Sequence, residues 1–472
     1  MHASQIDTEL VEANPWWRDP VGWEREDVQL RTVRSSPLSY EPKPLDDLQP
    51  GGLYILRGPR RVGKSTALKQ LISERIRAGM SVRRILHASV EGRSAEDVAD
   101  IVRRGATHWL EDGEAGQRLW LLDEITAVHG SWPATIKRLR DGHPSFAFDT
   151  VVLAGSSAVK FDEAGKLLAG RRHAADSDRI LFQMPFVEVT SALGTQLPPS
   201  PKLSLADLAD DGVVEAAVSE YRPWLQDLVD GWQQYLRVGG YPQAVAFHLD
   251  RGERREPALV EALWDVIQGD AFAGSRLTHT QTEAILRALT SSLTSLLSVH
   301  ALARHATMAS ETAAHRLDAL RRAFVAFPVH REQGLAPKPR AQSKWYFTDP
   351  ALARLAADMG AGSPPHPAAL SEQQLALSIL RALERRAPGA AVRHDRLLYY
   401  RSASKAEIDF VSADFATTCV ESKFVDSGWG RVFQTIEASG RSTGIVATRS
   451  GLKRHKGGWA LPAGLVAFLL GC

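Results

Sequence analysis

The sequence contains little cysteine and no long hydrophobic run. Its two cysteines, Cys419 and Cys472, lie far apart and show no metal-binding or redox spacing, which suits a reducing compartment and argues against a disulfide framework. No apolar stretch is long enough to cross a bilayer, and the first residues lack the apolar core of a signal peptide. We therefore expect a cytoplasmic protein that has no membrane partner.

A strong excess of one charge is also lacking. The chain has 57 Lys and Arg residues against 55 Asp and Glu residues, which gives a formal net charge of +2. This balance neither requires nor excludes nucleic acid, because a local basic patch matters more than the total charge. The composition, with 44% hydrophobic and 24% charged residues, is ordinary for a soluble protein. A length of 472 residues is enough for about two to four domains.

The most informative segment is a glycine loop that follows the apolar run 53–56 and matches G-x-x-x-x-G-K-[S/T]. In this pattern backbone N–H groups face phosphate oxygens, Lys64 reaches the β- and γ-phosphates, and the Ser65 hydroxyl coordinates Mg²⁺. The N-terminus of the helix expected after the loop also favours an anion. We therefore predict a phosphate-binding loop, formed by Gly58, Pro59, Arg60, Arg61, Val62, Gly63, Lys64, Ser65 and Thr66.

Two acidic residues end the next strongly apolar run. Residues 119–122 are typical of a parallel strand that is buried on both faces, and Asp123 and Glu124 follow at the end of the sheet where ligands of α/β proteins collect. Asp123 is predicted to hold Mg²⁺ through water, and Glu124 to orient or deprotonate the attacking water. The alternative is a strand that ends in a solvated acidic turn.

The order of the elements predicts an α/β fold. Extended segments at 53–57, 82–88, 119–122 and 150–155 alternate with helical patterns, which indicates a mostly parallel, three-layer sheet. This arrangement would bring the glycine loop and the acidic pair to the same edge of the sheet.

Four polar residues near this edge are further candidates for catalysis. Ser156 and Ser157 follow the last of these strands, where a hydroxyl could sense the γ-phosphate, although serine is also common in turns. Arg171 and Arg172 could stabilise transition-state charge, in the same chain or from a neighbouring subunit of a homo-oligomer. Equally, both arginines could be solvated at a helix end, where positive charge is favoured.

The rest of the chain is predicted to form three further regions around the 51–235 core. Residues 1–50 are expected to be an extended arm with aromatic anchors, 236–365 a helical lid and winged helix, and 366–472 a small α/β domain. Gly239 and Gly240 are interpreted as a hinge between core and lid.

The winged-helix interpretation covers 281–350, where three helical patterns precede a Gly- and Pro-containing extended region. Four basic residues of the third helix could meet DNA, or could form the solvated face of a lid. They are His315, Arg316, Arg321 and Arg322.

The last region contains strands with alternating apolar residues that carry Asp409, Glu421 and Lys423. Glu421 and Lys423 are two residues apart and share one sheet face, and Asp409 precedes them by about a hairpin. Two carboxylates and an ammonium suit metal-assisted phosphodiester hydrolysis, in which carboxylates bind Mg²⁺ and lysine helps to position or activate water. A salt-bridged pair of strands is the alternative.

With these motifs in order, the chain resembles a widespread prokaryotic family of AAA-type ATPases whose C-terminal region is similar to restriction-endonuclease-like domains of the PD-(D/E)xK type. The resemblance covers residues about 15–470 and includes Gly-Gly-Tyr-Pro at 239–242 and the segment 344–350. It implies that the glycine loop binds ATP, that Asp123 and Glu124 serve Mg²⁺ and water, and that Ser156 is a sensor. It also implies a nuclease-like site, with Glu372, Asp409 and Glu421 as metal ligands and Lys423 as a catalytic residue.

We therefore expect an ATPase with ATP and Mg²⁺ as cofactors that couples nucleotide state to engagement of DNA or another partner. Nuclease activity in genome maintenance or defence is a further expectation. The alternative is an ATP-controlled interaction switch in which the nuclease-like region serves only docking.

Overall fold

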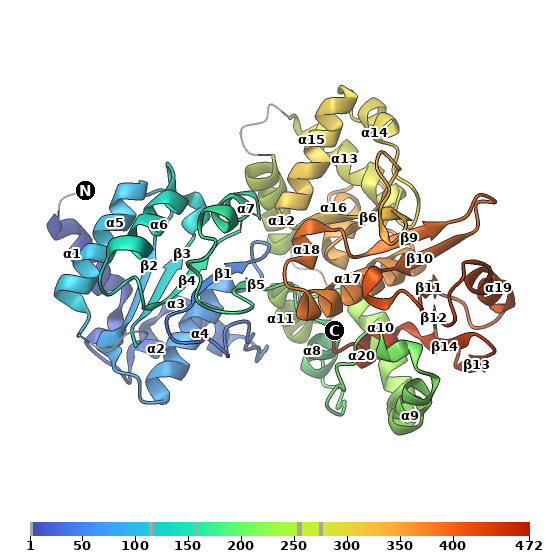
Figure 1. The fold of residues 1–472 in the computed structure, drawn as a ribbon, viewed down its shortest axis with the longest axis horizontal. Coiled ribbons are helices and arrows are strands. Elements are labelled where there is room, and N and C mark those ends of the chain that lie inside the picture. Colours follow the sequence, from blue (N-terminus) through green and yellow to red (C-terminus); the bar gives the residue numbers. More distant parts are fainter. Residues whose placement is uncertain (1–2, 113–116, 157, 253–256, 273–276) are drawn as a thin grey trace. The chain divides into compact units, whose positions relative to one another are not determined.

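The computed structural model describes residues 3–112, 117–156, 158–252, 257–272 and 277–472, and Figure 1 labels their helices and strands. The chain divides into two compact units, Met1–Phe182 and Gln183–Cys472. The boundary therefore lies well before the position near 235 that the sequence pattern predicts.

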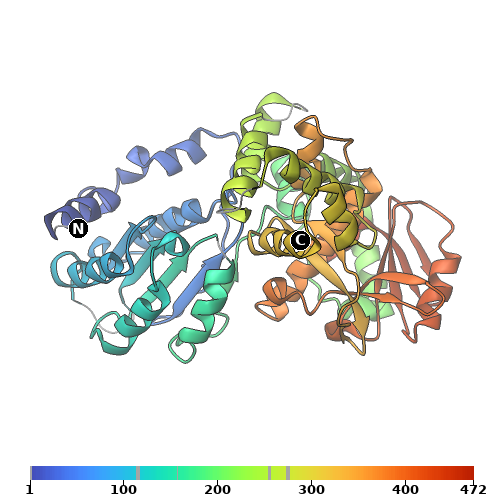
Figure 2. The same cartoon turned by 90° about the horizontal axis from the view of Figure 1, so that it is seen from above.

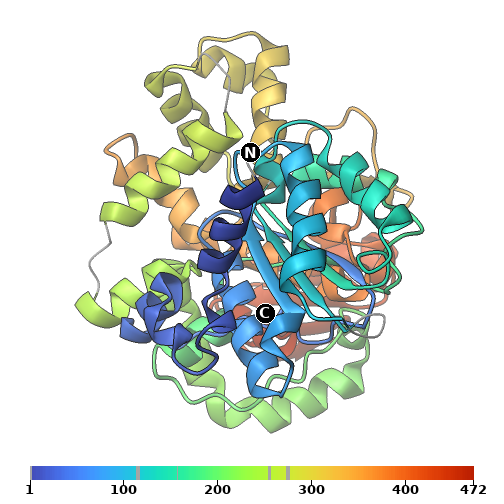
Figure 3. The same cartoon turned by 90° about the vertical axis from the view of Figure 1, so that its left-hand side faces the viewer.

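The first unit is built on a parallel sheet with the strand order β2-β3-β4-β1-β5 in its described residues. The sheet is flanked by helices (Figure 3). Its strands are β1 (Leu53–Arg57), β2 (Ile85–Ser89), β3 (Leu119–Asp123), β4 (Thr150–Ala154) and β5 (Asp178–Ile180). Its main helices are α4 (Lys64–Arg77), α5 (Ala95–Arg104), α6 (Trp132–Gly142) and α7 (Ala158–Leu167). The predicted parallel α/β fold is confirmed.

The apolar runs in the sequence become central strands. Every residue of β1, β3 and β4 is buried, as expected for parallel strands that are covered on both faces. The second strand begins later than predicted, at Ile85, because Val82–Arg84 form a 3₁₀ turn that is capped by the Ser81 side chain.

The expected extended arm is instead helical, and it covers the free edge of this sheet. It contains α1 (Ala3–Ala13), α2 (Trp23–Glu26) and α3 (Val28–Ser35). The Asn14 side chain accepts a hydrogen bond from His87 N (2.7 Å) and donates one to His87 O (2.9 Å), and Trp17 Nε1 donates to Ile85 O (2.9 Å). Side chains thus satisfy backbone groups of the edge strand β2. Trp16 and Trp17 of this segment are both buried.

The second unit combines helices with a large mixed sheet, whose orange to red strands are seen from above in Figure 2. Its described strands are β6 (Ala326–Gln333), β7 (Ala336–Pro337), β8 (Lys344–Phe347), β9 (Leu398–Arg401), β10 (Glu407–Val411), β11 (Val420–Lys423), β12 (Gly444–Thr448), β13 (Lys453–His455) and β14 (Gly458–Pro462). Its described α-helices are α8 (Phe186–Ala192), α9 (Asp211–Tyr221), α10 (Leu225–Val238), α11 (Pro242–Arg251), α12 (Pro257–Val266), α13 (His279–Ser291), α14 (Val299–His305), α15 (Ser310–Arg322), α16 (Pro350–Asp358), α17 (Pro367–Arg386), α18 (Ala390–Arg393), α19 (Gly430–Ala438) and α20 (Ala463–Leu469).

Strand pairing crosses the predicted boundary near 365. The helices α13, α14 and α15 and the antiparallel pair β6 and β8 occur in the order expected of a winged helix. However, β6 also pairs in parallel with β9, so His330 lies opposite Leu398 and Arg331 opposite Tyr399. The predicted wing and the predicted last domain therefore share one sheet, because long-range strand pairing overrides the local sequence signals.

The glycine pair at 239–240, interpreted from the sequence as a hinge between core and lid, lies inside the second unit and not at the boundary between the units. Gly240 N donates to Asp349 Oδ2 (2.7 Å), and Met184 N donates to Gly240 O (2.7 Å). Gly239 has φ +86°, and a Cβ there would lie 2.5 Å from Asp349 Oδ1. The glycines are required by a tightly packed turn.

Candidate functional site

The glycine loop connects the end of β1 to the start of α4. Gly58 lies so close to the chain after β5 that a Cβ would stand 2.0 Å from Leu181 O. Gly63 has φ +95° and begins α4, and a Cβ there would meet no atom within 4 Å. The loop therefore needs glycine once for close packing and once for a left-handed backbone next to open space. This open space lies at the N-terminus of a helix, which favours an anion.

The loop holds its lysine in a buried position. Lys64 Nζ donates to Gly58 O (2.9 Å) and Pro59 O (2.8 Å), and the residue is 5% exposed. Ser65 follows in the first turn of α4, whereas Arg60 and Arg61 are exposed. The predicted loop residues thus form one continuous cradle that contains a positive charge.

The acidic pair lies at the carboxyl end of β3. Asp123 is buried, and its Oδ1 accepts a hydrogen bond from Glu124 N (2.9 Å). Glu124 has a left-handed backbone with φ +54° and ψ +36°, a conformation that is uncommon for a residue with a side chain and that recurs at functional sites. Burial raises the pKa of Glu124, the charges of Lys64 and Arg60 oppose this rise, and the charge of Asp123 adds to it. The glycine loop and the acidic pair therefore act on each other electrostatically.

These residues fit ATP and Mg²⁺. Backbone N–H groups, the Lys64 ammonium and the α4 N-terminus suit phosphate oxygens. The Ser65 hydroxyl and the Asp123 carboxylate are hard oxygen ligands of the kind that Mg²⁺ prefers. The donor set required for a nucleotide is thus present in one unit of the protein.

Comparison with known families agrees with this geometry. Residues 51–190 match the family model of an AAA domain. We call the matched part of the first unit the AAA domain. Residues 229–363 match the model of a domain of unknown function, and no curated protein matches the chain.

Several solved structures are similar to the chain. A Walker-type ATPase of Pyrococcus abyssi is 13% identical, with a TM-score of 0.40, over 71% of this chain and 95% of that one. The ORC2 protein of Aeropyrum pernix is 10% identical, with a TM-score of 0.32, over 66% and 88%. RuvB of Thermotoga maritima is 13% identical, with a TM-score of 0.28, over 69% and 91%.

Of the four further residues predicted to act on the nucleotide, the structure describes Ser156, Arg171 and Arg172. Ser156 follows β4, which lies between β3 and β1 in the sheet of the AAA domain, whereas Ser157 lies outside the described residues. The two arginines both have acidic partners within the unit. Arg171 pairs with Asp141 through two nitrogens (2.5 and 3.0 Å), and Arg172 pairs with Asp178.

The residues predicted to form the nuclease-like site do lie together in the second unit. Asp409 on β10 and Glu421 on β11 are neighbours, since Asp409 N donates to Glu421 Oε2 (2.8 Å). Ser422 N donates to Asp409 Oδ2 (2.9 Å), and Lys423 Nζ lies 2.8 Å from Glu421 Oε1. Glu372 reaches the same group from α17, where it is buried.

Lys344 on β8, which was not predicted to belong to this site, lies at its centre. Its Nζ is 2.6 Å from Asp409 Oδ1, 2.8 Å from Glu407 Oε1 and 3.4 Å from Glu372 Oε1. The residue is 1% exposed. We call Lys344, Glu372, Glu407, Asp409, Glu421 and Lys423 the charge cluster.

The pKa values in the charge cluster reflect burial and this lysine. Burial and then the charge of Asp409 raise the pKa of Glu372 to about 7 and that of Glu421 to about 8. Burial alone would raise the pKa of Asp409, but the adjacent Lys344 ammonium lowers it below its ordinary value. Burial opposes the charged form of Lys344, yet its three carboxylate neighbours raise its pKa.

The expected Mg²⁺ site at Glu372, Asp409 and Glu421 does not fit this arrangement. In the parts of the chain that the structure describes, no three or more His, Cys, Asp or Glu side chains are placed to hold a metal ion. The sequence pattern does not point to Lys344, because this residue joins the carboxylates only through the tertiary fold.

The basic side chains expected to face DNA are largely engaged within the second unit. Arg321 and Arg322 on α15 both pair with Asp318, and Arg321 Nη1 also donates to Val392 O (3.2 Å). The Arg316 guanidinium lies 5.9 Å from the centre of the Phe272 ring. His315 and Arg322 are exposed, and His315 Nε2 lies 3.9 Å from Glu311 Oε1. Two arginines of α15 thus share one carboxylate, and the third packs on an aromatic ring.

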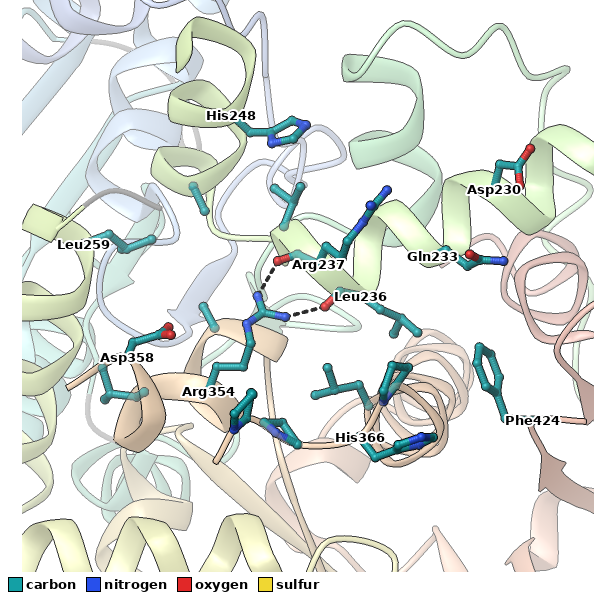
Figure 4. Close-up of a pocket in the computed structure, with 18 of the residues that line it drawn as sticks. Asp230, Gln233, Leu236, Arg237, His248, Leu259, Arg354, Asp358, His366 and Phe424 are labelled. Carbon is teal, nitrogen blue, oxygen red and sulfur yellow. Dashed lines mark hydrogen bonds between the residues drawn. The ribbon is translucent and has the colours of Figure 1, made fainter. Parts of the chain in front are cut away.

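The second unit also contains a cavity of about 960 Å³, shown in Figure 4. Its wall comes from α10, α11, α12, α16 and the start of α17. At its centre Arg354 donates to the carbonyl oxygens of Leu236 and Arg237, which end α10. The arginine thus caps a helix C-terminus, where positive charge is favoured.

Among the described residues, none of the helices combines the length and the apolar character that crossing a bilayer requires.

Proposed function

We propose that this chain is a Mg²⁺-dependent ATPase that couples ATP binding and hydrolysis to engagement of a partner by its second unit. The observation that carries the proposal is the buried Lys64 in the glycine loop after β1, on the same parallel sheet whose strand β3 ends in Asp123 and Glu124. The match of residues 51–190 to an AAA domain supports it.

Each residue of the AAA site has a proposed role. The loop N–H groups and Lys64 hold the β- and γ-phosphates, while Ser65 and Asp123 hold Mg²⁺, which when bound neutralises charge on the phosphate oxygens. Glu124 orients the attacking water and takes its proton, and its raised pKa makes it a stronger base than an ordinary carboxylate. Ser156 is proposed to contact the γ-phosphate.

Of the two arginines, Arg171 is the better candidate for transition-state stabilisation in a homo-oligomer. Its side chain is 31% exposed and that of its partner Asp141 is 45% exposed, so this ion pair is weakly held and can exchange partners. The Arg172 side chain is 17% exposed and also donates to Ser177 Oγ (3.0 Å), which suits a structural role.

For the second unit we favour the role of an ATP-controlled interaction switch over that of a nuclease. The charge cluster supports this choice, since the buried Lys344 ammonium pairs with Glu372 and Asp409, two of the carboxylates that a nuclease would use for metal. The partner is proposed to be DNA or a protein, and one experiment separates them.

That experiment measures ATP hydrolysis by the full chain with Mg²⁺ or EDTA, and with or without duplex DNA. We expect turnover that requires Mg²⁺. A faster rate with DNA assigns DNA as the partner, whereas an unchanged rate assigns a protein. ATP binding without turnover under all conditions would refute the hydrolysis part of the proposal.

A further inference from the structure

The ammonium group of Lys344 lies at the centre of the charge cluster. Three carboxylates from two elements, Glu372 on α17 and Glu407 and Asp409 on β10, converge on the single nitrogen of Lys344 at 2.6 to 3.4 Å. Carboxylates that converge on one point are the usual setting of a divalent metal in a protein. Here the point of convergence is an ammonium group.

The carboxylate oxygens of the cluster also have other donors. Asp409 Oδ2 accepts from Ser422 N (2.9 Å), and Glu372 Oε1 accepts from the Tyr346 hydroxyl (2.6 Å). Glu421 uses Oε2 for Asp409 N and Oε1 for Lys423. A magnesium ion needs near-octahedral oxygen ligands at about 2.0–2.1 Å and usually keeps several waters. The buried surroundings of Lys344 offer no such water shell unless the ammonium leaves.

We infer that Lys344 is a built-in cation that takes the place of the divalent metal in the nuclease-like centre, and that this centre binds neither Mg²⁺ nor Mn²⁺. The inference goes beyond the proposed ATPase function and does not depend on it. It assigns the carboxylates a different task, which is to hold β8 against α17 and β10 through one buried ammonium.

This task predicts how the cluster responds to loss of the lysine. An ammonium buried to 1% exposure is tolerated because it is paired, and removing it leaves Glu372 and Asp409 buried without their counter-charge. Such a group of carboxylates should then attract the cation that the wild-type protein excludes. Lys344→Ala opens space for an ion, while Lys344→Met removes the charge and keeps most of the side-chain volume.

The test uses the full chain without nucleotide, so that ATP brings no metal to the AAA domain. Mn²⁺ binding is followed by electron paramagnetic resonance, in which the signal of free Mn²⁺ falls on binding, and thermal melts are recorded with EDTA or Mn²⁺. The variants are Lys344→Ala, Lys344→Met, Asp409→Asn and the double variant Lys344→Ala with Asp409→Asn. Lys453→Met is the control, because Lys453 is an exposed lysine on β13 of the same sheet.

We expect the wild type and Lys453→Met to show the same melting temperature in EDTA and Mn²⁺ and no Mn²⁺ binding that depends on Asp409. Both Lys344 variants should melt at lower temperature in EDTA. Mn²⁺ should bind Lys344→Ala and restore part of its melting temperature, and Asp409→Asn should abolish both effects.

Two results would overturn the inference. One is Mn²⁺ binding by the wild type that Asp409→Asn removes, which remains measurable even if the Lys344 variants fail to fold. The other is a melting temperature of Lys344→Met that equals that of Lys453→Met.

Discussion

Replacement of Asn14 by leucine should destabilise the AAA domain from outside its nucleotide site. Asn14 is fully buried and makes three hydrogen bonds of 2.7 to 2.9 Å, one to Leu10 O and two to the backbone of His87. Leucine has a similar volume but can make none of them, so the N–H and C=O groups of His87 remain buried without this partner. At about 1 kcal/mol for each bond, the loss is about 3 kcal/mol.

For a unit of this size, each 1 kcal/mol lowers the melting temperature by about 2–4 °C, so Asn14→Leu should lower it by about 6–12 °C. The relevant transition is the one that ATP shifts upward, because a ligand stabilises only the unit that binds it. Thr8→Ala is the control, since Thr8 makes an exposed hydrogen bond to Ser4 O on the same arm. Equal melting temperatures for the two variants would refute the view that the arm stabilises the edge of the sheet.

Three further predictions concern the AAA domain. Lys64→Ala should weaken ATP binding by about tenfold to a hundredfold, since hydrogen bonds to charged groups contribute about 1.5–3 kcal/mol. Glu124→Gln should retain ATP binding and lower kcat by about 10²- to 10⁴-fold. Calorimetry measures the binding and a phosphate-release assay the turnover, and wild-type turnover in Glu124→Gln would contradict the role assigned to Glu124. Burial raises the pKa of Asp149 to about 6, so its stabilising contribution is full below pH 3.8 and is lost as the pH rises through 6. Asp149→Asn should remove this pH-dependent contribution. The melting temperature of the ATP-sensitive transition is measured for the wild type and the variant from pH 4 to 7, and the same pH dependence in both proteins would contradict the prediction. Arg171→Ala should reduce kcat only at protein concentrations that allow self-association, and a loss that is independent of concentration would place its role within one chain.

The nucleotide site could be predicted from the sequence because its parts are local. The loop from Gly58 to Thr66 is continuous, and its glycines, lysine and serine have fixed offsets that the phosphate chemistry demands. The acidic pair follows directly on an apolar strand, so its place at the edge of a parallel sheet follows from the strand itself. For the same reason the carboxylates on β10 and β11 were correctly placed side by side, since a short hairpin separates them.

The partners of these groups could be found only in the tertiary structure. Lys344 contacts Asp409, which lies 65 residues later in the sequence, because β6 pairs with both β8 and β9. A local sequence pattern cannot predict such a long-range contact. The contact of Arg321 on α15 with Val392 O also appears only when α18 is placed beside that helix. Local periodicity and motif spacing thus determine which groups exist and which element carries them, whereas long-range strand pairing determines which charges meet. That pairing brings Lys344 to two of the carboxylates that the sequence analysis predicts as metal ligands.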